Sequence, residues 1–313
     1  MRLRIGTRNS HLARTQSESI AEQLVAAGHT TELVPITTAG DRSRAPVFAS
    51  IGPQGVFVRE INQALATGSI DLAVHSYKDV PTNGPDELAI AAVPPRIDAA
   101  DCLLIRTELV DRGNGILPLP EGARVGTSSV RRQAWLNHLR ADLRPEPLRG
   151  NVPTRIRRLQ EGGYDAIVLA AAGLERLQTS GPDELTVFRS ERITVERLDP
   201  EQFVPAPAQG ALALQCRRDR ADVREALAPL DHSATRNAID AERLLLARLE
   251  GGCELAFGAY CHSSDSECVM HAMLEREGHI SVETRHGAEP LAVADDLWRL
   301  LNSTRSGTPS TSC

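Results

Sequence analysis

The chain has 313 residues, of which 41% are hydrophobic and 24% charged, and its net charge is −6. This length exceeds one ordinary hydrophobic core, so we expect a globular protein of two or three domains. The acidic balance argues against a protein that binds the phosphate backbone of nucleic acids. Aromatic residues make up 3% of the chain, which argues against base stacking as well. We therefore expect no nucleic-acid partner.

The sequence also indicates where in the cell the protein works. No apolar run approaches the length of a membrane span, and the start at Met1 reads directly into a strand without room for a signal peptide. The six cysteines are scattered without a CxxC pair, and the nine histidines show no pairing with cysteines or carboxylates at ligand spacing. We expect a cytoplasmic protein with reduced thiols, no membrane partner and no bound metal.

Short apolar runs alternate with amphipathic stretches along most of the chain. The pattern predicts strands at 2–7, 31–37, 72–75, 88–93, 102–106, 124–126 and 166–170, and helices at 11–27, 56–67, 129–140 and 152–160. Such a βαβ series favours an α/β fold with mostly parallel, doubly wound sheets. After residue 219 the pattern changes to two helices, short strands at 256–261, 267–274 and 280–284, and a last helix at 292–301.

Proline-rich breaks at 94–95 and 201–210 divide this series into domains. We expect three domains and a tail. They are a first cleft domain at 1–95 plus about 205–220, a second cleft domain at 96–204, a smaller C-terminal α/β domain at 221–302 and a disordered tail at 303–313.

Lys78 is the only lysine among 35 basic side chains, and it follows a predicted buried strand directly. A codon-biased genome would explain the 34 arginines, and the lysine that stays is then a candidate for a point charge that a guanidinium cannot replace. The carboxyl end of a strand is also where open α/β sheets bind their ligands. Asp79, beside this cation, is a candidate for stabilising a positive charge that develops on a substrate.

Arginine is concentrated between Arg124 and Arg158, where nine arginines accompany only two acidic residues. Two predicted helix starts in this region, and a third after the first strand, combine free backbone N–H groups, hydroxyls and guanidinium forks. Each turn alone is more typical of a capped helix or a solvated helix face. Three of them in adjacent domains predict a cleft for a ligand with several negative charges. The residues concerned are Arg8, Ser10, Thr127, Ser128, Ser129, Arg131, Arg132, Arg149 and Arg155.

Cys253 follows paired glycines directly after a predicted helix, where the backbone can turn sharply and present the thiol on a loop. A cysteine is more often a small buried hydrophobe than a reactive group. No neighbouring histidine or lysine in the sequence would activate this thiol. The sequence therefore does not predict a conventional Cys–His catalytic pair.

Seven motifs resemble, in order and spacing, those of the porphobilinogen deaminase family, also called hydroxymethylbilane synthases. They are GTRNSHLARTQ, HSYKDVP, VGTSSVRRQ, LRGNVPTRI, AAAGLERL, PAPAQGA and LEGGCELAFGAY, and together they span about Arg4 to Leu301. The resemblance implies three domains, two of them like periplasmic binding proteins, and a dipyrromethane cofactor held through a cysteine thioether. It also implies a transferase that condenses four porphobilinogen molecules, with loss of ammonia at each step, into linear hydroxymethylbilane.

The resemblance assigns roles to the residues singled out above. Asp79 matches the catalytic aspartate, and Cys253 matches the cofactor attachment point, which would place the cofactor on the C-terminal domain. The family's remaining properties imply a cytoplasmic monomer of tetrapyrrole and haem biosynthesis that passes its product to uroporphyrinogen-III synthase. The residues implied to bind the substrate or cofactor are Arg8, Ser10, Gln16, Lys78, Thr127, Ser128, Ser129, Arg131, Arg132, Arg149, Arg155, Arg176 and Gln209.

Three positions depart from the family's common pattern. Gln54 stands where many members have a lysine in a mobile active-site loop, Ala208 replaces the usual glycine before Gln209, and Gln215 replaces the usual glutamate. These departures also fit a second reading, in which the chain is a divergent paralogue with slow turnover.

Two further readings fit part of the pattern. A non-enzymatic anion-binding module would share the cleft and the arginine turns, but it has no need for a third domain or for the Gly-Gly-Cys turn. A Schiff-base enzyme would explain the single lysine, but an ammonium beside Asp79 is a poor imine former unless it is desolvated.

Overall fold

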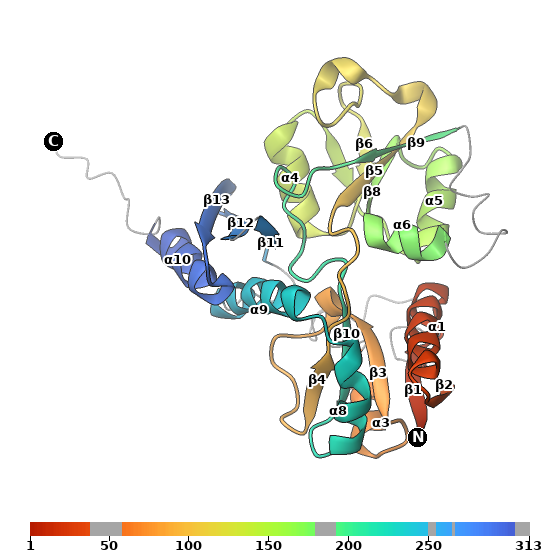
Figure 1. Ribbon diagram of the computed structural model, residues 1–313. Helices are drawn as coiled ribbons and strands as arrows, with labels where there is room; N and C mark the ends of the chain where they lie inside the picture. The colour runs from red at the N-terminus through yellow and green to blue at the C-terminus, as the bar shows by residue number, and fades with distance from the viewer. Residues whose placement is uncertain (38–57, 179–191, 250–254, 265–266, 304–313) are drawn as a thin grey trace.

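The computed structural model describes residues 1–37, 58–178, 192–249, 255–264 and 267–303. Within these ranges the strands form two five-stranded sheets and one three-stranded sheet (Figure 1). We call the first five-stranded sheet with its helices the first lobe, the second one the second lobe, and the three-stranded sheet the C-terminal sheet. The helices of the described ranges are all too short or too polar to cross a membrane.

The first lobe has the strand order β2-β1-β3-β10-β4. Four of its strands run in one direction, while β10 pairs antiparallel with both β3 and β4. Helices α1 and α8 cover one face of the sheet and α3 covers the other, so the sheet is doubly wound. The bounds are β1 Arg2–Arg8, β2 Thr30–Ile36, β3 Leu72–Ser76, β4 Leu88–Ala92, β10 Leu212–Arg217, α1 His11–Ala26, α3 Arg59–Ala66 and α8 Ala221–Leu227.

The second lobe repeats this plan with the strand order β7-β6-β8-β5-β9. Here β5 is the strand that pairs antiparallel, with β8 on one side and β9 on the other. Leu103 and Ile105 of β5 enter the core under α4, and Cys102 and Leu104 enter the opposite core under α5 and α6. The bounds are β5 Asp101–Arg106, β6 Arg124–Gly126, β7 Arg144–Glu146, β8 Ala166–Ala170, β9 Ile193–Arg197, α4 Val130–Leu139, α5 Val152–Gln160 and α6 Ala171–Gln178.

The expected mostly parallel, doubly wound sheets are confirmed, with one reversed strand in each, β10 in the first lobe and β5 in the second. The pattern predicts β1 to β6 and β8 to within about two residues, but it does not predict β7, β9 or β10. The antiparallel strand in each sheet is the one that the chain enters after it crosses from the other lobe, so the crossing itself causes the reversal of direction.

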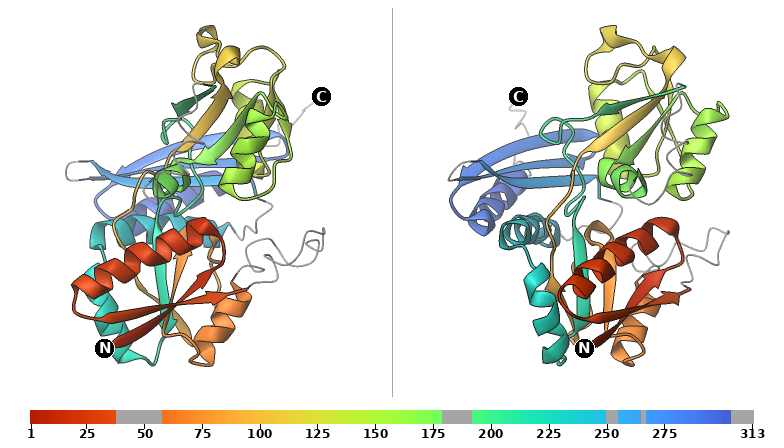
Figure 2. Two further views of the ribbon diagram at one scale, coloured as in Figure 1. Left: turned by 90° about the vertical axis from the view of Figure 1, so that its right-hand side faces the viewer. Right: turned by 45° about the vertical axis from the view of Figure 1, so that its right-hand side comes forward.

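Two segments outside the helices and strands connect the lobes. We call residues 93–100 the outgoing segment and residues 198–211 the return segment. Gln209 of the return segment donates from Nε2 to the carbonyl oxygens of Ala99 and Ala100, at 2.8 and 3.2 Å. The two segments therefore lie side by side between the lobes, as both views of Figure 2 show.

The C-terminal sheet has the order β11-β12-β13 and is antiparallel throughout. One face packs under α9 and α10, and residues of the other face join the core of the second lobe. The bounds are β11 Phe257–Ser264, β12 Glu267–Arg276, β13 His279–Gly287, α9 Ser233–Arg248 and α10 Pro290–Ser303. The described part of the chain also has short 3-10 turns at Tyr77–Asp79, Thr107–Leu109, Arg112–Asn114 and Ala228–Leu230.

Glu242 of α9 joins all of these parts at one point. Its fully buried carboxylate accepts from Arg96 of the outgoing segment at 2.6 Å and from the backbone N–H of Ala208 in the return segment at 2.6 Å. It also accepts from the backbone N–H of Cys261 in β11 at 2.8 Å. Loss of one partner of such a buried pair costs about 3–5 kcal/mol, so this contact fixes where the C-terminal sheet meets the lobes.

Candidate active site

The strand β3 ends in a 3-10 turn at Tyr77–Asp79, and Arg243 of α9 holds this turn in place. The guanidinium of Arg243 lies 4.4 Å from the centre of the Tyr77 ring. The same guanidinium donates to the carbonyl oxygens of Val80 and Pro81 at 2.9 and 2.8 Å. The end of the strand is thereby fixed from outside the sheet, and the turn presents its two charged side chains in a defined position.

These two side chains have different surroundings. Lys78 is half-buried, and its Nζ donates to the Oε1 atom of Gln209 at 3.2 Å. Asp79 is exposed at the end of the turn, and its carboxylate acts on Lys78 as a favourable charge. The structure thus confirms that the lysine and the aspartate stand together at the carboxyl end of a buried strand.

A buried polar network continues from Lys78 into the second lobe. Gln209 donates from Nε2 to Asp101 at 2.9 Å. Asp101 in turn accepts from Arg131 and from Arg132, each at 2.7 Å. Five polar residues from the 3-10 turn after β3, the return segment, β5 and α4 therefore form one continuous chain of contacts between the lobes.

Burial and charge shift the acid–base properties of this network. Desolvation, together with the charges of Arg131 and Arg132, lowers the pKa of Lys78 to about 8, although Asp79 and Asp101 oppose this shift. Burial alone would raise the pKa of the Asp101 carboxyl, but the two guanidinium groups hold that pKa well below its usual range. Desolvation also lowers the pKa of Arg131. The network therefore has an excess of positive charge that is poorly hydrated, which suits it to anions.

The hydroxyls at the start of α4 form the turn that precedes the helix. Thr127 accepts from the backbone N–H of Ser129 at 3.2 Å, and Ser129 caps the helix by accepting from Arg132 N at 3.5 Å. Ser128 exchanges hydrogen bonds with the backbone of Leu148, at 2.9 and 3.0 Å. All three hydroxyls have contacts within the protein, and their predicted role in ligand binding stays a prediction.

The first lobe contributes a matching turn at the carboxyl end of β1. Ser10 caps α1 by accepting from Ala13 N at 3.4 Å, and the buried Gln16 donates to Ser76 Oγ at 2.9 Å. Arg8 is half-buried near His75. Burial lowers the pKa of His75 to about 4, and the Arg8 charge adds to that shift.

The remaining predicted arginines lie at the second lobe. Arg155 donates to Gly150 O at 2.7 Å, and desolvation with the charge of Arg132 lowers its pKa. Arg176 donates to Gly210 O, next to Gln209, at 2.8 Å, and desolvation lowers its pKa to about 10. Arg149 is exposed before α5, and among the described residues its side chain has no hydrogen bond or ion pair with the network.

Cys253 and Gln54 lie outside the described residues, so their predicted roles are proposals. Ala208, one of the departures from the family pattern, is fully buried and has a φ of 62°, in the left-handed region that favours glycine. Gln215, another departure, hydrogen-bonds His75 through Oε1 at 3.0 Å.

Sequence reasoning missed the residues that organise the site. These residues are Asp101, Glu242 and Arg96. Each contacts partners that lie thirty or more positions away in the sequence, so no local motif identifies them. The one signal for Asp101 was an acidic residue at the head of an apolar run.

The fold and the network define a two-lobed α/β protein with a positively charged, partly desolvated site at the carboxyl ends of its strands. The profile of the family described as "Porphobilinogen deaminase, dipyromethane cofactor binding domain" matches residues 3–225 of this sequence. The chain belongs to the porphobilinogen deaminase family, and the cofactor of that family is a dipyrromethane.

Several relatives cover most of the sequence. A porphobilinogen deaminase of Mycobacteroides abscessus is 43% identical over 98% of this chain and 92% of its own length. Those of Nocardia farcinica and Syntrophobacter fumaroxidans are 47% and 43% identical over 84% and 87% of this chain, and over 71% and 84% of their own lengths. The periplasmic VFT2 domain of Bordetella pertussis BvgS aligns with 76% of this chain and 92% of its own length at 13% identity, with a TM-score of 0.42.

Proposed function

We propose that this protein is a hydroxymethylbilane synthase, a transferase that joins four porphobilinogen molecules head to tail with loss of ammonia at each step. Its product would be linear hydroxymethylbilane, the precursor of the tetrapyrrole ring system. We further propose that it acts as a cytoplasmic monomer and that it passes its product to uroporphyrinogen-III synthase. We also propose that its domains divide near the boundaries predicted from the sequence, except that α8 (Ala221–Leu227), which packs on the first lobe, belongs to the first domain. Family membership over nearly the whole chain supports the reaction.

The observation that carries the proposal is the network from Lys78 through Gln209 and Asp101 to Arg131 and Arg132. Porphobilinogen carries two carboxylates, and the growing product adds two more with every ring. An acidic protein with a net charge of −6 needs a locally cationic site to bind such a chain. The desolvated cations between the lobes provide it.

Asp79 is proposed as the catalytic group. When porphobilinogen loses its amine, positive charge develops over the pyrrole ring, and a fixed carboxylate against the pyrrole N–H stabilises that charge. The same carboxylate can pass a proton to the leaving amine, which departs as ammonia. Its exposure leaves Asp79 accessible to substrate, and the turn fixed by Arg243 provides the positioning that electrostatic catalysis requires.

Arg131 and Arg132 fit the carboxylates of the dipyrromethane cofactor. Their Nε atoms are buried and, among the described residues, have no hydrogen-bond partner. A buried donor without an acceptor is costly, so these atoms suit an acceptor that a bound molecule brings. Arg155 and Arg176, whose guanidinium groups are desolvated, would hold further carboxylates. When bound, the cofactor supplies the pyrrole carbon to which the first substrate ring is joined.

The decisive experiment compares two variants of Asp79 on folded, cofactor-loaded protein. Asp79→Asn keeps the shape of the side chain and removes its charge, so turnover of porphobilinogen should fall by roughly 1000-fold or more. Asp79→Glu keeps the charge but displaces it by one methylene, so the loss should be smaller, on the order of 100-fold. Asp86→Asn, at an exposed acid of the same lobe, is the matched control and should leave turnover unchanged.

The alternative is that Asp79 has only a structural role and pairs with the charge of Lys78 at the end of β3. In that case Asp79→Asn would lower stability slightly and keep turnover within a few-fold of the wild type. That result, on protein shown by circular dichroism to be folded, would remove Asp79 from the mechanism.

Cys253 is proposed as the attachment point of the cofactor through a thioether. The intact mass of the denatured protein should exceed the mass of the encoded chain by one two-ring pyrrole unit. Cys253→Ser should lack this excess, and Cys313→Ser should keep it. A wild-type mass equal to that of the bare polypeptide, in cells supplied with precursor, would refute the attachment.

One observation favours the Schiff-base alternative: the lowered pKa of Lys78, about 8, is a property that imine-forming lysines need. Porphobilinogen, however, has no carbonyl at its reacting carbon, and the Lys78 Nζ is hydrogen-bonded to Gln209. Borohydride added during turnover should therefore trap no substrate on Lys78. A substrate adduct at Lys78 in the peptide map would support the Schiff-base reaction instead.

A further inference from the structure

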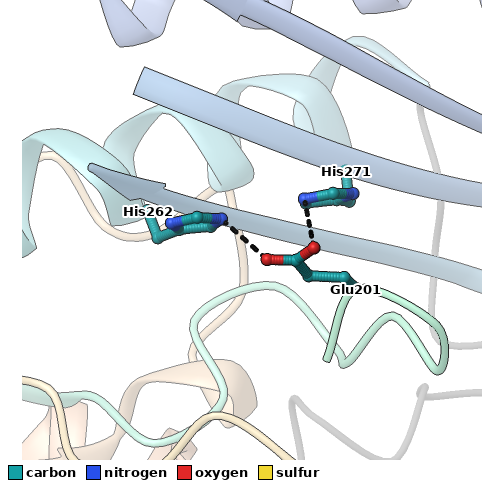
Figure 3. A group of neighbouring side chains, drawn as sticks. All are labelled: Glu201, His262 and His271. Atoms are coloured by element: carbon teal, nitrogen blue, oxygen red, sulfur yellow. Dashed lines mark ion pairs between the residues drawn. The ribbon is translucent and has the colours of Figure 1, made fainter. Parts of the chain in front are cut away.

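A group of three side chains lies where the return segment meets the C-terminal sheet (Figure 3). Glu201 comes from the return segment, His262 from β11 and His271 from β12. In the antiparallel register Tyr260 lies opposite His271, so His262 and His271 are diagonal neighbours on one face of the sheet. Their rings are nearly parallel, with an interplanar angle of 5° and centroids 5.9 Å apart.

Both imidazole rings direct Nε2 toward the carboxylate of Glu201. The Nε2 atom of His262 is 3.3 Å from Oε1 of Glu201, and that of His271 is 4.0 Å from Oε2. Both Nε2 atoms are inaccessible to water, and within the described ranges neither has a hydrogen-bond partner. His271 is only 7% exposed. Two buried ring nitrogens without hydrogen bonds, aimed at one carboxylate, call for a ligand between them.

The ring of His271 is held in the orientation that a metal ligand requires. Its Nδ1 atom forms a hydrogen bond with Thr284 Oγ1 at 3.0 Å, which leaves Nε2 as the free ligand atom. Tyr260 stacks on His262 with ring centroids 5.2 Å apart and on His271 with centroids 6.3 Å apart. A hydrogen bond from the second nitrogen and lateral packing of the ring are the supports that metal-binding histidines have in known sites.

The spacing of the ligand atoms fits a small transition-metal ion. One ligand atom from each residue lies within 4.8 Å of the others. Metal–ligand bonds of about 2.0–2.2 Å place tetrahedral ligands roughly 3.4 Å apart. The His262–Glu201 distance of 3.3 Å already meets this value. The His271–Glu201 distance of 4.0 Å is longer, and we expect the Glu201 side chain, which is 51% exposed, to shorten it when the ion binds.

We propose that Glu201, His262 and His271 form a binding site for a divalent transition-metal ion, with Zn²⁺ the best fit. Two imidazoles and one carboxylate are a zinc donor set, and they leave a fourth position for water. Mg²⁺ and Ca²⁺ fit poorly, because they require a shell of oxygen ligands.

The bound ion would tie the C-terminal sheet to the return segment. Two residues beyond Glu201, Phe203 is buried in the core of the second lobe, and the carbonyl oxygen of Val204 accepts from Arg131 of the polar network. The ion therefore acts on the part of the return segment that supports the site between the lobes. The ion would be structural: it would link the C-terminal sheet to the return segment and take no part in the reaction.

The test is a metal titration of the full, untagged chain after treatment with a chelator. Co²⁺ should bind one ion per chain with the visible absorption of a four- or five-coordinate site, and Zn²⁺ should displace it. Glu201→Gln, His262→Gln and His271→Gln should each weaken the affinity at least ~10-fold, and so should the loss of the supporting hydrogen bond in Thr284→Val. His279→Gln, at an exposed histidine of the same sheet, is the matched control and should bind like the wild type.

Binding should also raise the unfolding temperature of the wild type and of His279→Gln, but not that of Glu201→Gln. Because Glu201 is exposed, Glu201→Gln should keep the fold. A difference in metal binding between this variant and the wild type therefore does not come from disrupted core packing. No Co²⁺ binding to the wild type would overturn the proposal and leave only a His–Glu ion pair. Equal binding by the wild type and Glu201→Gln would place the ion elsewhere and overturn it as well.

Discussion

Replacing Asp101 with asparagine tests whether the buried ion network holds the lobes in place. The Oδ2 atom accepts from Arg131, while the Oδ1 atom accepts from Arg132 and from Gln209. An asparagine amide offers one oxygen and one NH2 group. Whichever way this amide is turned, its NH2 group faces at least one donor. The substitution therefore keeps the shape of the side chain but removes the charge that balances two guanidinium groups.

The cost follows from burial. Asp101 is 0% exposed, and Arg131 and Arg132 are 4% and 7% exposed, so water cannot replace the lost carboxylate. Removal of one partner from a buried ion pair costs about 3–5 kcal/mol. Domains are stable by only about 5–15 kcal/mol, so we expect Asp101→Asn to remove a large part of the stability of the second lobe.

Urea unfolding measured by tryptophan fluorescence is the assay. Trp135 lies in the core of the second lobe and donates to the Val204 carbonyl oxygen that also accepts from Arg131. A Trp298→Phe background leaves Trp135 as the single reporter. Asp219→Asn, which breaks an exposed ion pair, is the matched control and should barely move the midpoint. An Asp101→Asn midpoint equal to that of the control would refute the reasoning.

The pH dependence gives a second check with a definite sign. The pKa of Asp101 is held below its value in the unfolded chain, which is about 3.9. Its contribution to stability is therefore complete above that pH and is lost as the pH falls below it. The stability gap between wild type and Asp101→Asn should be full at neutral pH and should narrow below about pH 4. A gap that stays constant on acidification would contradict the assignment.

Further predictions concern single residues. Ala208→Gly removes the strain of a left-handed backbone at a non-glycine residue, about 1–2 kcal/mol. It also loses a buried methyl group worth about 0.8 kcal/mol and makes the unfolded chain more flexible. Because these effects oppose each other, the free energy of unfolding measured in urea should change by less than about 1 kcal/mol. Gln215→Glu should raise the pKa of His75, now about 4 because of burial, as measured by NMR titration. The kcat/KM for porphobilinogen should fall as the pH rises through about 8, since Lys78 then loses its charge, and Lys78→Arg should remove this fall. Burial raises the pKa of Cys102 to about 12, so peptide mapping should find it alkylated by iodoacetamide only after unfolding.

Each of these predictions has a contrary outcome. A large loss of stability in Ala208→Gly, or an unchanged His75 in Gln215→Glu, would show that these positions are not coupled as described. An activity profile that is flat above pH 8 would remove the Lys78 charge from substrate binding, and rapid alkylation of Cys102 in the native protein would contradict its burial.

Local sequence patterns predict the parts of the structure that local interactions determine. The buried strand β3 ends where its apolar run ends, and this placed Lys78 and Asp79 correctly at its carboxyl end. Ser10 and Ser129 cap helices, as their place before an amphipathic stretch predicts. Such features depend on neighbours within a few residues.

Features that depend on distant partners were not predictable from one sequence. Asp101 reads as a single acid before an apolar run, and Glu242 as an ordinary charge on an amphipathic helix, yet both are fully buried and bind several segments. The direction of β5 and β10 likewise depends on where the chain crosses between lobes. His262 and His271 became neighbours only through the register of β11 and β12.

The position of β10 between β3 and β4 has a consequence for how the chain is made. The first lobe is translated first, but its sheet lacks an inner strand until Leu212–Arg217 has left the ribosome. Until then β3 and β4 each expose an unpaired edge, which is a template for pairing with other chains. The described strands of the second lobe lie between residues 101 and 197, so this lobe can close earlier. The lobe at the amino terminus is therefore the later of the two to be completed, and fragments that end before residue 212 should be prone to aggregation.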